Sequence, residues 1–124
     1  MGYKLKTSKQ TEDLLLLMER SENLPVFALV KLAISLSLRS GGLSDDDMST
    51  DTRGREFNRH TVTGDFDCLY KCLMELSLNR HLNDDEFFPY YVKAHLDRGT
   101  ALLEQERQYG SDFLVHLSEL DRAI

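Results

Sequence analysis

The stretch that follows Pro25 constrains the fold of this chain more than any other feature. Only three polar residues interrupt the apolar run Val26–Leu38, so a helix here is apolar on nearly all sides and must be buried on nearly all sides. A chain of 124 residues forms one domain and can hardly surround such a helix alone. We therefore predict a homo-oligomer with this helix at its interface, contacted through Phe27, Val30, Ile34 and Leu38.

The rest of the pattern predicts a mainly helical, all-α fold of four to five helices in a single domain, residues 1–124. Residues 1–40 are expected to form a strand and two helices, 41–64 a mobile loop and an extended basic segment, and 65–124 the C-terminal helices. Helical periodicity covers residues 8–22, 66–82 and 90–108, with a short final helix at 113–120. Gly99 lies inside a predicted helix at a cost of roughly 1 kcal/mol, which indicates close packing against another helix.

A short basic strand is predicted at the N-terminal end, where Tyr3, Leu5 and Thr7 alternate with polar residues. Its wet face carries Lys4 and Lys6. A strand followed by two helices is the ribbon–helix–helix plan, in which two strands pair across a dimer and enter a DNA groove. The periodicity leaves two interpretations open, a DNA-contacting edge or a strand that only builds an oligomer.

Charge divides the chain unevenly. Residues 1–60 carry nine basic and nine acidic side chains, whereas residues 61–124 carry six basic and twelve acidic ones, which accounts for the net charge of −6. A polyanion contact is therefore expected in the first half. A second basic patch there comprises Arg53, Arg55, Arg59 and His60, at and after the end of a polar, mobile loop predicted at residues 44–54.

The residues that could carry chemistry form no recognisable catalytic or metal-binding motif. Cys68 and Cys72 are four apart on a predicted helix, and we interpret them as ordinary buried cysteines. The four histidines are scattered, and no glycine-rich phosphate loop or H-E-x-x-H pattern occurs. The sequence thus predicts no enzymatic activity, no metal site and no cofactor. It contains no apolar run long enough to span a membrane, so a cytoplasmic protein with no membrane partner is expected.

Three short stretches together resemble the DndE family of DNA sulfur-modification (phosphorothioation) proteins. They are Leu5–Thr11 with the helix pair that ends at Leu29–Leu38, then Glu56–Gly64 leading into Tyr70, and finally His95–Gly99. The resemblance covers roughly residues 4–104, and the order and spacing of the stretches carry it.

This resemblance implies a small helical accessory subunit that forms homotetramers and binds duplex DNA, including nicked duplex. The family works beside a cysteine desulfurase, a sulfur-transfer protein and an SMC-like ATPase, and the subunit itself is not the sulfur-transfer catalyst. Family members tend to carry a basic cluster at the end of the first helix, but here Met18–Glu22 has one arginine between two glutamates. The predicted DNA-binding residues are therefore Lys4, Lys6, Lys9, Arg53, Arg55 and Arg59.

Two other functions remain open from the sequence. One is a scaffold that joins the SMC-like ATPase to the sulfur-transfer protein without touching DNA, with the acidic second half as its docking face. The other is a ribbon–helix–helix-like transcriptional regulator.

Overall fold

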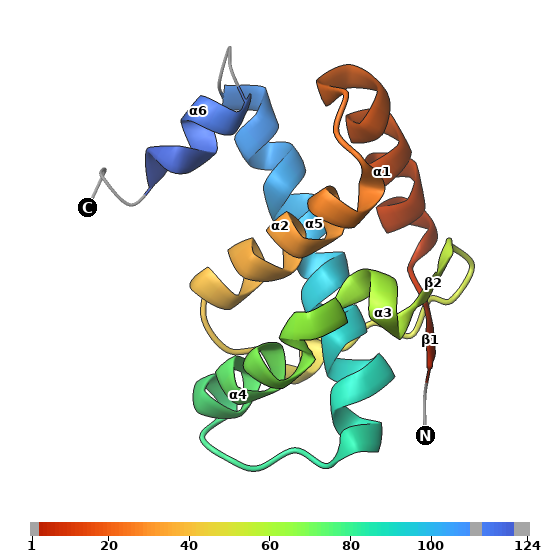
Figure 1. Cartoon of the computed structure of the whole chain (residues 1–124), viewed down its shortest axis with the longest axis vertical. Helices are drawn as coiled ribbons and strands as arrows, with labels where there is room; N and C mark the ends of the chain where they lie inside the picture. The colour runs from red at the N-terminus through yellow and green to blue at the C-terminus, as the bar shows by residue number, and fades with distance from the viewer. Residues whose placement is uncertain (1–2, 110–112, 121–124) are drawn as a thin grey trace.

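The computed structural model of this chain describes residues 3–109 and 113–120 (Figure 1). Its elements run in the order β1 (Lys4–Lys6), α1 (Lys9–Glu22), α2 (Val26–Arg39), η1 (Asp45–Asp47), β2 (Glu56–Asn58), α3 (Arg59–Val62), η2 (Gly64–Phe66), α4 (Asp67–Leu78), η3 (Glu86–Tyr91), α5 (Val92–Tyr109) and α6 (Phe113–Ser118). The mainly helical class predicted from the sequence is confirmed. No single helix in the described ranges is long and apolar enough to cross a membrane; only α1 and α2 together, bent by 116° at their break, reach that length and composition.

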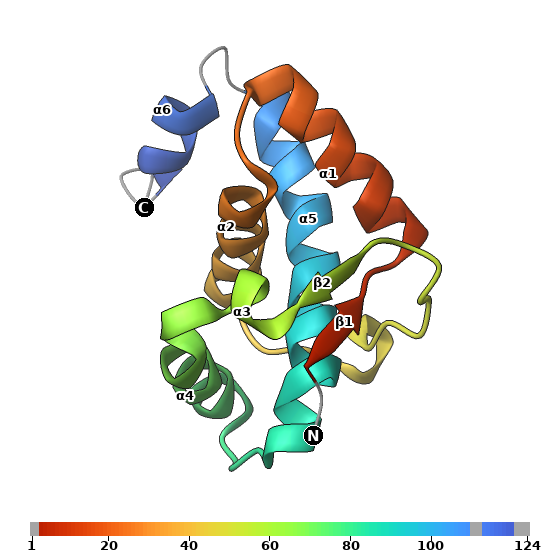
Figure 2. The ribbon, with the colours of Figure 1, turned by 45° about the vertical axis from the view of Figure 1, so that its right-hand side comes forward.

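Helix α5 lies at the centre, and α1 and α2 pack along it (Figures 1 and 2). The crossing of α2 and α5 depends on Gly99, because a Cβ built there would lie 1.8 Å from the backbone oxygen of Ala33. This confirms the predicted close packing at Gly99. Helix α1 starts where the Ser8 side chain accepts a hydrogen bond from the Thr11 amide, and it ends at Asn23 in the left-handed conformation.

One copy of the chain buries α2, and this corrects the main prediction made from its composition. Val30 and Ile34 are fully buried, and Leu38 packs against the core as a partly buried residue, whereas 53% of Phe27 is exposed. Helices α1, α3, α4 and α5 all contact α2, so the short chain covers it by surrounding it with several elements. Val30 and Ile34 therefore cannot be interface residues, and the apolar composition of α2 no longer argues for an oligomer.

Strand β1 pairs with β2 of the same chain, in antiparallel register with Leu5 opposite Phe57 (Figure 2). Both of these side chains are buried, while the flanking residues of each strand are exposed. The ribbon–helix–helix prediction, in which the strand would pair with its copy in a second subunit, is wrong for this reason. The expected extended segment is also shorter than predicted, since Arg59–Val62 already forms the turn of helix α3.

The segment expected to be a mobile loop is anchored to the fold. Lys93 of α5 donates hydrogen bonds from its ammonium to the Asp51 backbone oxygen at 2.6 Å and to the Ser49 hydroxyl at 3.2 Å. Ser44 begins the turn η1, where its side chain and that of Asp47 form a capping box. These contacts fix a stretch that its composition alone marks as solvated.

Helix α4 turns most of its apolar side chains outward. Tyr70 and Met74 are buried, but apolar side chains three and four residues apart are exposed, namely Phe66 just before the helix and Leu69, Leu73 and Leu76 on it. Cys68 and Cys72 are exposed as well, so the prediction of buried cysteines is wrong. Residues 70 and 74 lie on the opposite side of the helix from residues 68 and 72, and packing selected the former pair.

Candidate nucleic-acid interface

Two basic segments far apart in the sequence lie side by side in the fold. The amide of Gly54 donates to the backbone oxygen of Thr7 at 2.9 Å, and the amide of Thr7 donates to the oxygen of Arg55 at the same distance. Gly54 permits this approach, because a Cβ there would lie 2.2 Å from the Ser8 backbone oxygen. The backbone segments that carry five of the six predicted cations thereby adjoin, and we call this place the basic corner: Lys4, Lys6, Lys9, Arg53 and Arg55.

The two lysines of the basic corner on β1 project from the wet face of the ribbon. Lys4 is paired with Glu56 across the strands at 3.7 Å, and the Lys4 side chain is 63% exposed. Lys6 is also exposed, and within the described residues its side chain makes no ion pair. The strand alternation predicted from the sequence therefore places both ammonium groups in solvent.

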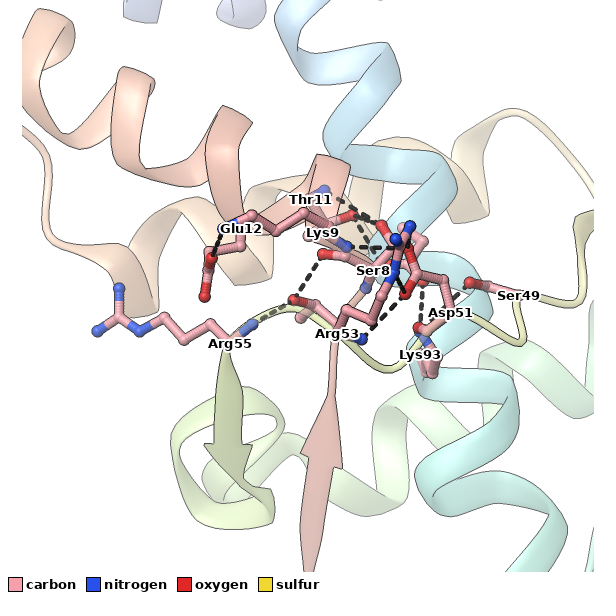
Figure 3. A network of polar contacts seen from close by, with 11 residues as sticks. Ser8, Lys9, Thr11, Glu12, Ser49, Asp51, Arg53, Arg55 and Lys93 are labelled. Atoms are coloured by element: carbon pink, nitrogen blue, oxygen red, sulfur yellow. Dashed lines mark hydrogen bonds and ion pairs between the residues drawn. The ribbon is translucent and has the colours of Figure 1, made fainter.

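Asp51 ties the next two cations together at the start of α1 (Figure 3). Its carboxylate accepts from the Lys9 amide at 3.2 Å and from the amide and Nε of Arg53 at 2.9 and 3.0 Å. The hydrogen bonds from Arg53 hold the pKa of Asp51 far below its usual range, and the Lys9 amide adds to the effect. Arg53 nevertheless remains 80% exposed, so its guanidinium still faces solvent.

Carboxylates accompany the remaining cations of the basic corner. The ammonium of Lys9 contacts Glu12 and Asp13 on α1, which raises the pKa of Lys9. Arg55 donates to Glu19 at 3.1 Å and lies 5.0 Å from the ring centre of Phe57. The surface is therefore a mixed one, with cations that can exchange a carboxylate partner for a phosphate oxygen.

Arg59 lies outside the basic corner and has a structural role. Its guanidinium donates to Asp67 and to Asp84 at 2.7 Å each, and its side chain is only 17% exposed. It also lies 5.4 and 5.2 Å from the ring centres of Phe87 and Phe88. The two carboxylates raise the pKa of Arg59. The prediction that Arg59 contacts DNA conflicts with this geometry, because its donors already join β2–α3 to the starts of α4 and η3.

Asp97 is a central residue that the sequence analysis missed. One of its carboxylate oxygens accepts from the Ser8 amide at 3.2 Å and from the Thr11 hydroxyl at 2.6 Å. The other accepts from the Lys93 ammonium at 2.8 Å. Asp97 thus fixes the start of α1 and the anchor of the 49–51 segment, the two parts that carry the basic corner. Its signal in the sequence is the spacing of four from Lys93 on one helix.

Two residues close to Asp97 on α5, His95 and Arg98, bind the C-terminal end of α2. Ser37 Oγ lies 2.8 Å from His95 Nδ1, and both residues are buried. Burial lowers the pKa of His95 to about 4, and the nearby charge of Arg98 adds to the shift. Arg98 itself donates to the backbone oxygens of Ser37 and Gly41 at 2.6 Å each. Ser37 and His95 therefore join α2 to α5, and a substrate cannot reach them.

Comparisons with known proteins identify a family. A profile of the DNA sulphur modification protein DndE matches residues 4–111. The crystal structure of DndE from Escherichia coli B7A, involved in DNA phosphorothioation modification, superposes with a TM-score of 0.66 at 19% identity, covering 83% of this chain and 97% of that one. The DndE G21/24K mutant, involved in DNA phosphorothioation, gives 0.61 at 20% identity, covering 82% and 97%. The comparison with curated proteins gives no match.

Proposed function

The chain belongs to the DndE family of DNA sulphur modification proteins, and on this premise we propose that it is a non-catalytic, DNA-associated subunit of a DNA phosphorothioation system. The observation that carries the proposal is the basic corner. In an acidic chain with net charge −6, the segments that carry five cations adjoin at β1, the start of α1 and the segment before β2. The basic corner is the surface we assign to duplex DNA, including nicked duplex.

Contact through this surface would be made to the phosphate backbone. Lysine and arginine donors on a strand and at a helix start hold a duplex in position without reading its bases. The carboxylates beside four of the five cations lower the attraction, so binding should be weak at physiological salt and should strengthen steeply at low salt.

A non-catalytic role agrees with the chemistry of the polar groups. The serine–histidine pair with the closest contact, Ser37 and His95, is buried in the α2–α5 crossing and serves packing. The cations of the basic corner bind anions, and the carboxylates beside them are engaged in ion pairs with those cations. We therefore propose that the sulfur chemistry belongs to other subunits, among them a sulfur-transfer protein and an SMC-like ATPase.

The test is binding of intact and nicked duplex measured over a series of salt concentrations. The slope of log K against log salt counts the phosphates neutralised, at about 0.9 per phosphate. Lys6→Gln should weaken binding and reduce the slope by about 1. The matched control is Arg20→Gln, which removes an exposed cation from the far end of α1 and should leave the slope unchanged.

Failure of the folded protein to bind either duplex at low salt would remove the DNA role. Equal losses in Lys6→Gln and Arg20→Gln would show a diffuse attraction rather than a site at the basic corner.

A second candidate function, an adaptor between proteins, is favoured by α4. We define its apolar stripe as Phe66, Leu69, Leu73 and Leu76, which are 54%, 53%, 39% and 76% exposed. Apolar residues spaced by three and four along an exposed helix are typical of a helix-docking surface. The stripe could serve self-association, for which we propose a homotetramer, or bind another subunit. Co-purification with the ATPase and sulfur-transfer proteins, compared between the wild type and Leu76→Glu, tests the adaptor role.

A further inference from the structure

A groove of about 610 Å³ opens beside the basic corner, between strand β1, the 48–52 segment and the residues that lead into α5. Its volume lies within the range of small-molecule and cofactor sites, about 300–1,000 Å³. Its lining includes lysines, threonines and one tyrosine, namely Lys4, Lys6, Thr50, Thr52, Tyr90 and Lys93.

An aromatic ring stands at the rim of this groove. Phe87 and Phe88 are fully buried, but Phe88 takes an extended conformation, with φ −127° and ψ 123°, that interrupts the helix before Pro89. The backbone changes direction at this point. The side chain of Tyr90, the residue after Pro89, is 62% exposed and lines the groove. An exposed ring beside lysines offers a flat surface on which a base can stack.

The groove is built on fixed contacts. Lys93 is only 7% exposed, and its ammonium binds the Asp51 backbone oxygen at 2.6 Å and Asp97 at 2.8 Å. These bonds hold the 49–51 segment against α5, and the exposed residues Thr50 and Thr52, within and just after this segment, line the groove. Because Asp97 neutralises the charge of Lys93, this lysine holds the wall of the groove in place and is not assigned to anion binding.

The anion-binding capacity of the groove lies on β1. Lys6 has no ion-pair partner among residues 3–109 and 113–120, and Lys4 shares its charge with the exposed Glu56 at 3.7 Å. Glu56 is the carboxylate of the lining. The two ammonium groups are exposed on the same strand face, two residues apart. This spacing allows them to bind two consecutive phosphate groups of a nucleic-acid strand.

From this arrangement we infer that the groove takes one unpaired nucleotide of DNA, with the base on the Tyr90 ring and the backbone phosphates on Lys4 and Lys6. A paired base inside a duplex presents only its edges, so a single tyrosine in a groove can stack on a base only after that base has left the helix. The inference rests on the proposed DNA role and deepens it: the basic corner holds the duplex, and the groove beside it holds a strand end or a displaced base.

The test compares a blunt duplex with the same duplex carrying a short single-stranded thymidine overhang, by fluorescence anisotropy at low salt. Tyr90→Ala should lose about tenfold in affinity for the overhang duplex and leave the blunt duplex unchanged. Tyr90→Phe keeps the ring and should stay within about twofold of the wild type. Glu56→Gln frees Lys4 and should bind the overhang duplex about threefold more tightly.

The matched control is Leu17→Ala, which removes an exposed apolar side chain of α1 outside the groove and outside the apolar stripe and should change neither affinity. Thermal unfolding of each variant establishes that it is folded. Equal binding of the two duplexes with no effect of Tyr90→Ala overturns the groove and leaves the DNA role standing, whereas no binding of either duplex overturns both. The inference is also overturned if Tyr90→Ala loses the same affinity for both duplexes. It is overturned as well if the variant weakens binding to a protein partner and not to DNA.

Discussion

At the scale of single residues, the stretch His95–Gly99 determines how the first two helices meet α5. His95 and Arg98 hold the C-terminal end of α2, and Asp97 holds the start of α1. Gly99 lets the backbones of α2 and α5 approach. Four of five consecutive residues therefore have an architectural role, and the basic corner depends on them only through Asp97.

Replacing Gly99 by alanine should destabilise the protein strongly. The new Cβ would lie 1.8 Å from the Ala33 backbone oxygen, and a backbone atom cannot move aside as the tip of a side chain can. The two helices would have to separate, so we expect a loss of at least about 3 kcal/mol in the free energy of unfolding, measured by urea denaturation. Gln105→Ala, an exposed change on the same helix, should stay within about 0.5 kcal/mol.

His95 should make the stability of the protein depend on pH in mild acid. The folded protein keeps this buried imidazole neutral down to a pKa of about 4, whereas the unfolded chain binds a proton below about 6.5. The unfolded state therefore takes up more protons in this window, and the free energy of unfolding should fall by up to about 3 kcal/mol as the pH drops from 6.5 to 4.

Thermal unfolding across this pH range measures the effect. His95→Gln should flatten the dependence between pH 6.5 and 4, while His60→Gln, at an exposed position, should retain it. An unchanged slope in His95→Gln would assign the acid sensitivity to the carboxylates instead.

At the scale of elements, the basic segment from Arg53 to Arg59 divides into two parts with different roles. Its first part lies against β1 and the start of α1, where the Arg53 side chain is 80% exposed. Its last residue turns away with α3 and binds the carboxylates of Asp67 and Asp84. Arg59 is the first residue of α3, and from there its guanidinium reaches both carboxylates.

Opposite effects should therefore follow from neutralising the two arginines. Arg59→Gln leaves two partly buried carboxylates without their shared partner, so we expect a loss of about 2 kcal/mol in stability and an unchanged salt slope of DNA binding. Arg53→Gln should change stability by less than about 0.5 kcal/mol but weaken DNA binding. Chemical denaturation and salt-dependent binding on both variants measure the two effects, and a reversed result would return Arg59 to the DNA surface.

At the scale of the whole molecule, four of the exposed large apolar side chains among the described residues belong to the apolar stripe of α4, whereas α2 contributes Phe27. A single copy surrounds α2 with four other helices, but α4 keeps its apolar stripe in solvent. If the protein self-associates, this stripe is the surface that gains most from being covered.

Leu76→Glu should convert an oligomer to monomers, because it places a charge at the most exposed position of the apolar stripe. Native mass spectrometry of the wild type and the variant measures the subunit number. Leu17→Glu, at a leucine of α1 that is 45% exposed, is the matched control and should leave the subunit number unchanged. An oligomer that survives Leu76→Glu would place the interface on another face.

The sequence by itself determined the helical class, the strand at Lys4–Lys6 and the close packing at Gly99. These features depend on contacts between near neighbours or on the conformational freedom of one residue, and both are written in the local pattern.

Only the tertiary structure decided how the elements cover one another. The apolar periodicity of α2 and of α4 looks alike in the sequence, yet several helices surround the first while the second keeps one side in water. In the same way, Arg53 and Arg59 differ in their ion pairs. Arg53 pairs with the nearby Asp51 and stays exposed, whereas Arg59 pairs with Asp67, which is more distant in the sequence. A sequence pattern records which side chains avoid water, but which surface shelters them depends on partners far along the chain.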